Sequence, residues 1–277
     1  MNKIKKIYYF IQPSFKYIVL ILAAFVMLFP FYWMIIGAFK TSTEIAQYPP
    51  TVIPQNPTLD NIGKVFSNSA LGTYFLNSCI VAVVETILVA IISVLAAYAF
   101  YKYNFKGKKI LFISMLIVSM LPLEVVMVFN YKMMISWGLN NTLTALFLPF
   151  IGNFFYVYIL YNAFRTIPES VYSAAKMDGC SDWKFLWKIA LPTIRATLIF
   201  VCIMNVVSAW NSFAWPMLIT NSVESRTLPF GIYTYIGDVG ADNELIMAMT
   251  LISQLPVILL FIFLRKYFVN GFKSNNK

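Results

Sequence analysis

Long runs of apolar residues constrain this chain more than any other feature of its sequence. Each run is close to the 20 or so residues that a helix needs to cross the hydrocarbon core of a bilayer. Strands of a membrane barrel would instead alternate between apolar and polar residues over about 10 positions, and these runs do not alternate. We therefore predict an all-α membrane protein with six transmembrane helices, at residues 17–39, 72–101, 110–131, 143–164, 196–220 and 245–264.

The overall composition also favours a bilayer as the main surroundings of the chain. A soluble domain is usually near half apolar and a quarter charged, whereas these 277 residues are 60% apolar and 12% charged. The formal net charge of +10 would suggest a nucleic-acid partner in a soluble protein. In a membrane protein an excess of basic residues in the inner loops explains it better, so we expect no nucleic-acid partner.

The basic residues divide unequally between the two sides of the predicted helices. If the N-terminus lies inside, 17 of the 21 lysines and arginines fall on the inner side and four fall outside. Because cytoplasmic loops carry such an excess, we predict one multi-pass transmembrane domain over residues 1–277, with both termini in the cytoplasm. The first apolar run is too long for a cleaved signal peptide. Four prolines between Thr41 and Asn61 predict an extended outer loop.

Several kinds of catalytic or metal site are excluded by residue types alone. The chain contains no histidine, so neither a Ser-His nor a Cys-His catalytic pair can form. Its three cysteines, Cys79, Cys180 and Cys202, are far apart, and a zinc site needs clustered ligands. No P-loop motif occurs. We expect no catalytic residue, no metal and no cofactor in this chain, which disfavours a membrane-bound enzyme.

A charged segment separates the fourth and fifth predicted helices, at residues 165–195, and lies on the cytoplasmic side of the predicted topology. Thr166 and Glu169 have the spacing of a capping box, and Pro168 suits the first turn of a helix. Gly179 can adopt the left-handed conformation that closes a helix. The segment therefore predicts a short helix that ends at Gly179, followed by a second one.

The second short helix has its own start signal and an apolar face. Ser181 can cap it, Asp182 suits its first turn, and Pro192 suits the start of the following transmembrane helix. One interpretation is that the apolar face lies at the lipid surface, with tryptophans as interface anchors. The other is that it packs against protein. The face comprises Trp183, Leu186, Trp187 and Ala190.

The stretch AAKMDGCSDWKFLWKIALP closely resembles the EAA loop of ABC importer permeases. Further segments resemble the carbohydrate-uptake branch of that family, in particular the inner permease subunit of maltose-type transporters: WGLNNT, WNSFAWPMLI, RTLPFGIYTY and FLRKYFVNGF. Two positions depart from the family pattern, because Ser173 replaces the usual glutamate and Cys180 the usual small residue. The matching residues are Ala174, Ala175, Asp178, Gly179, Ile189, Leu191 and Pro192.

The resemblance implies a permease subunit of an ATP-driven importer for a sugar-like small molecule, located in a prokaryotic cell membrane. It implies a heterodimer with a second permease subunit and an extracytoplasmic solute-binding protein. Two ABC ATPase subunits would hold the ATP and magnesium. The loop would be the coupling helix that contacts one ATPase, and Ser173 would remove a carboxylate from that contact. The expected coupling residues are Ser173, Ala174, Ala175, Asp178, Gly179, Cys180, Trp183, Leu191 and Pro192.

Two carboxylates lie within the apolar runs, Glu85 in the second and Glu124 in the third. Ionisable residues inside a membrane are costly and often functional. A proton or ion relay through both would make the protein an ion-coupled secondary transporter or a channel, which is the alternative function. The other interpretation pairs each carboxylate with a polar group at a helix interface or places it near an aqueous cavity.

Polar residues spaced by three occur in the fifth run, with tryptophans nearby. Hydroxyl and amide groups combined with aromatic faces suit a sugar, so these residues are candidates for lining the translocation pathway. The other interpretation is hydrogen bonding between helices, which is common in membranes. The three residues are Asn205, Ser208 and Asn211.

Overall fold

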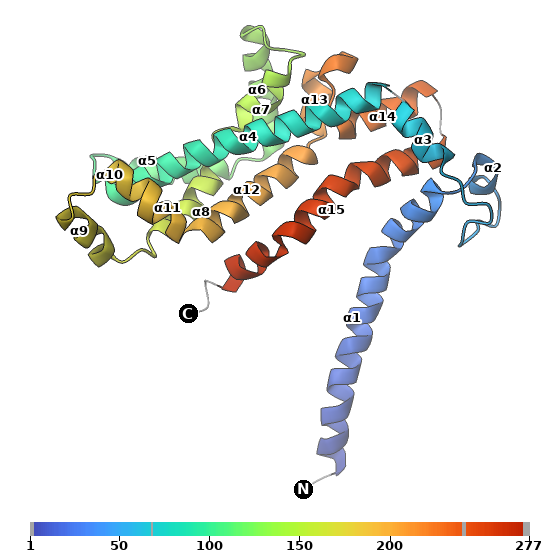
Figure 1. The fold of residues 1–277 in the computed structure, drawn as a ribbon, viewed down its shortest axis with the longest axis horizontal. Coiled ribbons are helices and arrows are strands. Elements are labelled where there is room, and N and C mark those ends of the chain that lie inside the picture. The colour runs from blue at the N-terminus through green and yellow to red at the C-terminus, as the bar shows by residue number, and fades with distance from the viewer. Residues whose placement is uncertain (1–2, 68, 240–241, 274–277) are drawn as a thin grey trace. The chain divides into compact units, whose positions relative to one another are not determined.

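The computed structural model describes residues 3–67, 69–239 and 242–273. The terminal residues 1–2 and 274–277, which we predicted to be cytoplasmic, lie outside the described residues. Within the described ranges every regular element is helical, so the all-α prediction is confirmed (Figure 1). The longer helices are α1 (Lys3–Ala38), α3 (Asp60–Ser67), α4 (Ser69–Lys102), α5 (Lys108–Ser119), α6 (Leu123–Ser136), α8 (Phe154–Phe164), α9 (Glu169–Met177), α12 (Arg195–Trp210), α14 (Leu228–Val239) and α15 (Asn243–Lys273).

Shorter elements connect these helices. The α-helical ones are α2 (Ser42–Ile45), α7 (Leu143–Phe147), α10 (Asp182–Phe185), α11 (Leu191–Thr193) and α13 (Ala214–Ile219). Two are 3₁₀-helices, η1 (Leu148–Phe150) and η3 (Val223–Ser225), and η2 (Leu186–Ala190) is a π-helix. The chain divides into two compact units, and each is described by itself: Met1–Ser69 with Thr234–Gln254, and Ala70–Tyr233 with Leu255–Lys277.

Three of the six predicted transmembrane helices are continuous. Segments Lys16–Ala38, Ala70–Lys102 and Asn243–Leu264 are long and apolar enough to cross a membrane. They agree with the first, second and sixth predicted spans. Side chains of Lys16–Ala38 are mostly exposed within the chain, so this helix presents apolar surface for lipid or for another protein.

The other three predicted spans are each interrupted by a short break between helices. Helices α5 and α6 meet at an angle of 99°, because Pro122 has no N–H to continue the helical hydrogen bonds. Residues 143–150 and α8 meet at 48°. Helix α12 ends at Trp210 and the chain resumes as α13. The third bent pair joins residues 182–193 to α12 at 79°, and by length and composition the described residues contain up to six spans if each bent pair counts as one.

Aromatic side chains form the core at one end of the second unit. Helix α8 packs against α5 and α12. The ring of Phe112 contacts those of Phe100 and Phe154 edge to face, with centroids 5.3 Å apart in each pair. The same core includes Phe185 and Leu186 from the segment that follows α9, and both are fully buried. The charged loop is therefore part of the packed structure.

The proline-rich segment at residues 41–61 belongs to the first unit and folds around one carboxylate. The Glu44 carboxylate accepts hydrogen bonds from the Thr51 hydroxyl at 2.7 Å and the Gln55 backbone N–H at 2.9 Å. Lys40 donates to the Thr51 carbonyl at 2.5 Å. The predicted extended loop was wrong, because these long-range bonds bend the segment back onto the end of α1. They also lower the pKa of Glu44, the Thr51 hydroxyl most strongly.

Candidate functional site

The first helix of the loop at 165–195 begins where the sequence predicts, but without the predicted cap. Helix α9 starts at Glu169, directly after Pro168, and no side chain caps it. The Thr166 hydroxyl instead donates to the Ala163 carbonyl at 2.7 Å. The capping-box prediction was wrong because Thr166 belongs to the end of α8, where it pairs with a carbonyl that lacks an intrahelical partner.

The turn after α9 has the predicted left-handed glycine. Gly179 has φ +72°, its N–H donates to the Lys176 carbonyl at 3.0 Å, and the Cys180 N–H donates to the Ala175 carbonyl at 2.9 Å. This pair of bonds is a Schellman motif, which satisfies the last carbonyls of a helix. The Ser181 hydroxyl then accepts the Lys184 N–H at 3.3 Å, so the predicted cap of the second helix is confirmed.

The second helix of the loop does not bury its predicted apolar face as one surface. Leu186 and Ala190 are buried, whereas Trp183 and Trp187 are 62% and 45% exposed. Residues 186–190 form a π-helix, whose i to i+5 hydrogen bonds shift the side chains out of the 3.6-residue register. The two tryptophan rings pack on each other, with centroids 5.6 Å apart, and form an exposed aromatic surface.

The predicted coupling residues divide into an exposed and a buried group. Ala175 and Leu191 are buried, and Cys180 is half-buried. Those on the outside are available to another protein, while the buried pair helps pack the loop. The exposed residues are Ser173, Ala174, Asp178, Gly179, Trp183 and Pro192.

Asp182 fastens the loop to the end of α4. Its carboxylate accepts hydrogen bonds from the hydroxyls of Tyr172 at 2.7 Å and Tyr103 at 3.2 Å, and it forms an ion pair with Lys176 at 2.8 Å. The Tyr98 hydroxyl donates to the Asp182 carbonyl at 3.3 Å. We call these contacts the Asp182 clamp. They join α10 to α9 and to the chain around the end of α4.

The Asp182 clamp should persist over the physiological pH range. The pKa of Asp182 lies below its ordinary value of 3.8, most strongly because of the hydrogen bond from Lys176 and next because of the one from Tyr172. Its contribution to stability is therefore complete above that ordinary pKa and is lost only as the pH falls through the lowered one. Backbone amide exchange of residues 172–186, corrected for the intrinsic rate, should be unchanged between about pH 7 and pH 5.

Substitution Asp182→Asn should make the same amides exchange several-fold faster, because the amide cannot form the ion pair with Lys176. Hydrogen exchange followed by mass spectrometry measures this. Asp178→Asn is the matched control, since that residue is exposed and lies in the turn rather than in the clamp. Equal exchange in native protein and Asp182→Asn would show that the clamp does not order the loop.

A cavity of about 320 Å³ lies within the second unit, and we call it the polar cavity after the polar side chains in its otherwise apolar lining. Segments of α4, α6, α12 and α13 contribute to its lining, as do the residues around η1 and before α14. Phe150 and Phe213, which are half-buried, supply aromatic surface. Its polar lining comprises Glu85, Asn153, Asn205, Ser208, Ser212 and Thr227.

Three of the five predicted pathway residues meet in this polar cavity. Glu85 and Asn205 are 6% and 3% exposed, and their side chains lie within hydrogen-bonding reach of each other. Asn205 also donates to the Thr86 hydroxyl at 3.0 Å. Ser208 lies one turn further along α12 and lines the same space.

The other two predicted pathway residues, Glu124 and Asn211, lie outside the cavity lining. Asn211 follows the end of α12, so it leaves the shared helix face, and its amide donates to the Val207 carbonyl at 2.9 Å. Glu124 is exposed in the first turn of α6. Sequence reasoning missed Asn153, Ser212 and Thr227, which reach the cavity from loops.

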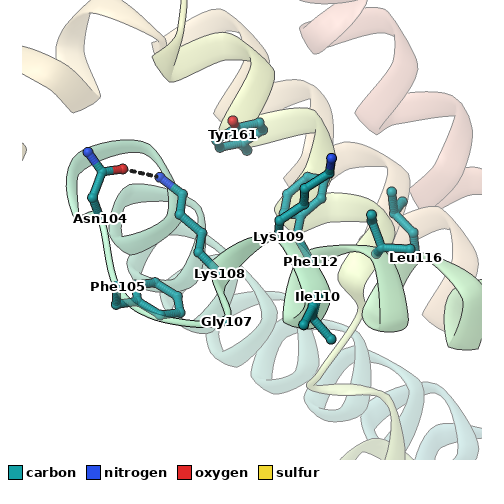
Figure 2. A pocket seen from close by; sticks show the side chains of 10 residues that line it. Asn104, Phe105, Gly107, Lys108, Lys109, Ile110, Phe112, Leu116 and Tyr161 are labelled. Atoms are coloured by element: carbon teal, nitrogen blue, oxygen red, sulfur yellow. Dashed lines mark hydrogen bonds between the residues drawn. The ribbon is translucent and has the colours of Figure 1, made fainter.

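A second and larger cavity, of about 740 Å³, contains none of the predicted site residues. It lies around the start of α5 and is lined mainly by apolar side chains together with Lys108 and Lys109 (Figure 2). The Lys108 side chain points toward Asn104 and donates to its side-chain oxygen at 3.3 Å.

Asn141 joins two loops at the other end of the second unit. It has φ +59°, and its N–H donates to the Ile219 carbonyl at 2.9 Å. Its side-chain oxygen accepts the N–H groups of Asn221 and Ser222 at 2.8 and 2.9 Å, and the Ser225 hydroxyl at 2.5 Å. The turn before α7 and the segment after α13 are therefore one hydrogen-bonded structure.

Long apolar helices, interrupted spans and a clamped loop between the fourth and fifth spans define a multi-pass helical membrane protein. Residues 90–274 match the family of binding-protein-dependent transport system inner membrane components. The chain belongs to this family, which confirms the resemblance seen in the sequence. It is an inner-membrane transport subunit.

Curated relatives match nearly the whole chain. An arabinooligosaccharides transport system permease protein, AraQ of Halalkalibacterium halodurans, is 33% identical over 251 residues, which is 90% of each chain. The lactose transport system permease protein LacG of Rhizobium radiobacter is 29% identical over 262 residues, or 95% of each. The sn-glycerol-3-phosphate transport system permease protein UgpE of Yersinia pestis is 27% identical over 271 residues, covering 95% of this chain and 96% of its own.

A solved structure has the same fold. It is a bacterial ABC transporter involved in the import of the acidic polysaccharide alginate, with a TM-score of 0.86 over 97% of this chain and 99% of that one. The two sequences are 20% identical, so the likeness concerns the fold.

Proposed function

We propose that this chain is one of two permease subunits of an ATP-driven importer for a sugar or a sugar-like solute. The family match supports a binding-protein-dependent transport role. The relatives' names support the solute class, since they include transporters of arabinooligosaccharides and lactose. The complex would comprise this chain, a second permease subunit, two ABC ATPases that hold ATP and magnesium, and an extracytoplasmic solute-binding protein.

In this proposal the loop at 165–195 faces the cytoplasm, as do both termini, and the loop docks on one ATPase. The excess of basic residues in the inner segments supports that orientation. The exposed surface of Ser173, Ala174 and Asp178 beside the Gly179 turn offers small side chains to an approaching partner. Since Ser173 has no carboxylate, this contact would depend on shape and backbone groups more than on an ion pair.

The Asp182 clamp is the observation that carries the mechanism. Because it fastens the loop to the end of α4, movement of the docked ATPase reaches α4 directly. The same loop continues through α11 into α12 across a bend of 79°. Helices α4 and α12 supply Glu85, Asn205 and Ser208 to the polar cavity. A rigid displacement of the loop would thus reshape the cavity from two sides.

Measuring which energy source drives solute uptake tests this function. Vesicles that contain the complete transporter and its binding protein should accumulate solute only when ATP is supplied inside, and uptake should survive a proton uncoupler. Uptake driven by a pH gradient without ATP would favour the ion-coupled alternative. That alternative needs Glu85 and Glu124 to act together, and the structure places Glu124 outside the cavity that Glu85 lines.

A further inference from the structure

We propose that the polar cavity is a solute subsite belonging to this subunit, built for one uncharged sugar ring and closed to anionic solutes. The proposal rests on the transport function proposed above and adds to it the charge class of the solute. It also assigns specificity to this chain, rather than to the binding protein or the second permease alone.

A buried hydroxyl without a partner is the first sign of a ligand. Thr227 is 3% exposed and lines the cavity. Among the residues that the structure describes, its Oγ1 atom has no hydrogen-bond partner. A buried polar group left unpaired is costly and uncommon, so a bound hydroxyl or a water molecule is expected to pair with it.

The remaining lining has the mixed character that a sugar requires. The Glu85 carboxyl group and the side chains of Asn153 and Asn205 offer acceptors and donors to ring hydroxyls. Phe213 lines the cavity, is only partly buried, and is held in place because its ring contacts those of Phe230 and Tyr233 edge to face, with centroids 6.2 and 5.3 Å apart. A fixed aromatic surface beside polar groups is typical of small-molecule sites.

Charge sets the class of solute. Within the described residues no lysine or arginine lines the cavity, while Glu85 contributes a carboxyl group. A phosphate, sulfonate or carboxylate would enter without a countercharge and would face that group, which discriminates against anions. The relatives include proteins named for neutral and for anionic solutes, such as lactose and sn-glycerol-3-phosphate. The lining of the cavity places this chain with the transporters of neutral solutes.

Size limits how much of the solute the cavity holds. A volume of about 320 Å³ lies at the lower end of the roughly 300–1,000 Å³ usual for small-molecule sites. The cavity therefore accommodates one sugar unit at a time, and an oligosaccharide would pass through it unit by unit.

Thiol labelling in the complete transporter tests the proposal without knowledge of the solute. Ser212 is half-buried and lines the cavity, so Ser212→Cys places a reporter there. The probes are two methanethiosulfonates, one carrying a trimethylammonium group and the other a sulfonate. Tyr48→Cys is the control because Tyr48 is 93% exposed, and the parent transporter, with its native cysteines, gives the background.

The expected result is that Ser212→Cys reacts with both probes, with a cation-to-anion rate ratio roughly tenfold or more above that of Tyr48→Cys. Adding Glu85→Gln should return the ratio to the control value. No reaction at Ser212→Cys would overturn the subsite, and an equal or inverted ratio would overturn the charge selection. A preference that survives Glu85→Gln would overturn the role of Glu85. ATP-driven uptake is measured separately, so each of these failures leaves the transport proposal standing.

Discussion

Replacing Gly179 with proline is expected to abolish solute-stimulated ATP hydrolysis by the assembled transporter. Proline fixes φ near −65° and removes the N–H, whereas Gly179 has φ +72° and donates to the Lys176 carbonyl. The turn between α9 and α10 would open, and the surface proposed to dock on the ATPase would lose its shape. ATP hydrolysis by purified complexes in lipid, with and without loaded binding protein, measures the effect.

Substitution Gly179→Asn is the control for this experiment. Asparagine tolerates the left-handed conformation, and a Cβ atom at this position would meet no other atom within 4 Å. We therefore expect stimulation to be largely retained in Gly179→Asn, and both variants to assemble because the turn is exposed. Normal stimulation in Gly179→Pro would show that the loop does not couple the subunits through this turn.

Substitution Gly231→Ala is expected to destabilise the second unit strongly. A Cβ atom at Gly231 in α14 would lie 2.0 Å from the ring of Tyr74 in α4, and that ring is buried. Since a packed aromatic ring cannot move aside easily, overpacking should cost about 1–3 kcal/mol. Thermal unfolding of the purified chain, or the yield of assembled complex, measures the loss.

Substitution Gly37→Ala provides a matched comparison in the first unit. Its Cβ atom would lie 1.9 Å from the sulfur atom of Met247. Methionine is flexible and can adopt another rotamer, so the cost should be much smaller than at Gly231. Equal losses in both variants would contradict the explanation based on side-chain flexibility.

Local chemistry made much of the fold predictable. A backbone inside hydrocarbon must satisfy its own hydrogen bonds, so each apolar run of sufficient length predicts a spanning helix. Gly179 and Ser181 were predictable for a similar reason, because a left-handed glycine and a serine cap act on neighbours within a few residues. The bend between α5 and α6 also had a local signal, the proline at position 122, which a prediction from hydrophobicity alone does not use.

Features that depend on distant contacts were not predictable. The Asp182 clamp brings together Tyr98, Tyr103 and Tyr172, and no sequence spacing marks these three tyrosines as partners of one aspartate. Spacing by three grouped Asn205 and Asn211, but that rule holds only while the helix continues, and α12 ends at Trp210. Helix ends without proline or glycine depend on tertiary packing.

The Asn141 turn constrains how the transporter can open on the side of the membrane where this turn lies. Five hydrogen bonds of Asn141 join the turn before α7 to the segment after α13, so these two parts should move as one rigid piece. A gate is therefore not expected between these two hydrogen-bonded parts. We expect the gate on that side to lie along the boundary with the second permease subunit, and the adjoining part of this chain to move as one rigid body.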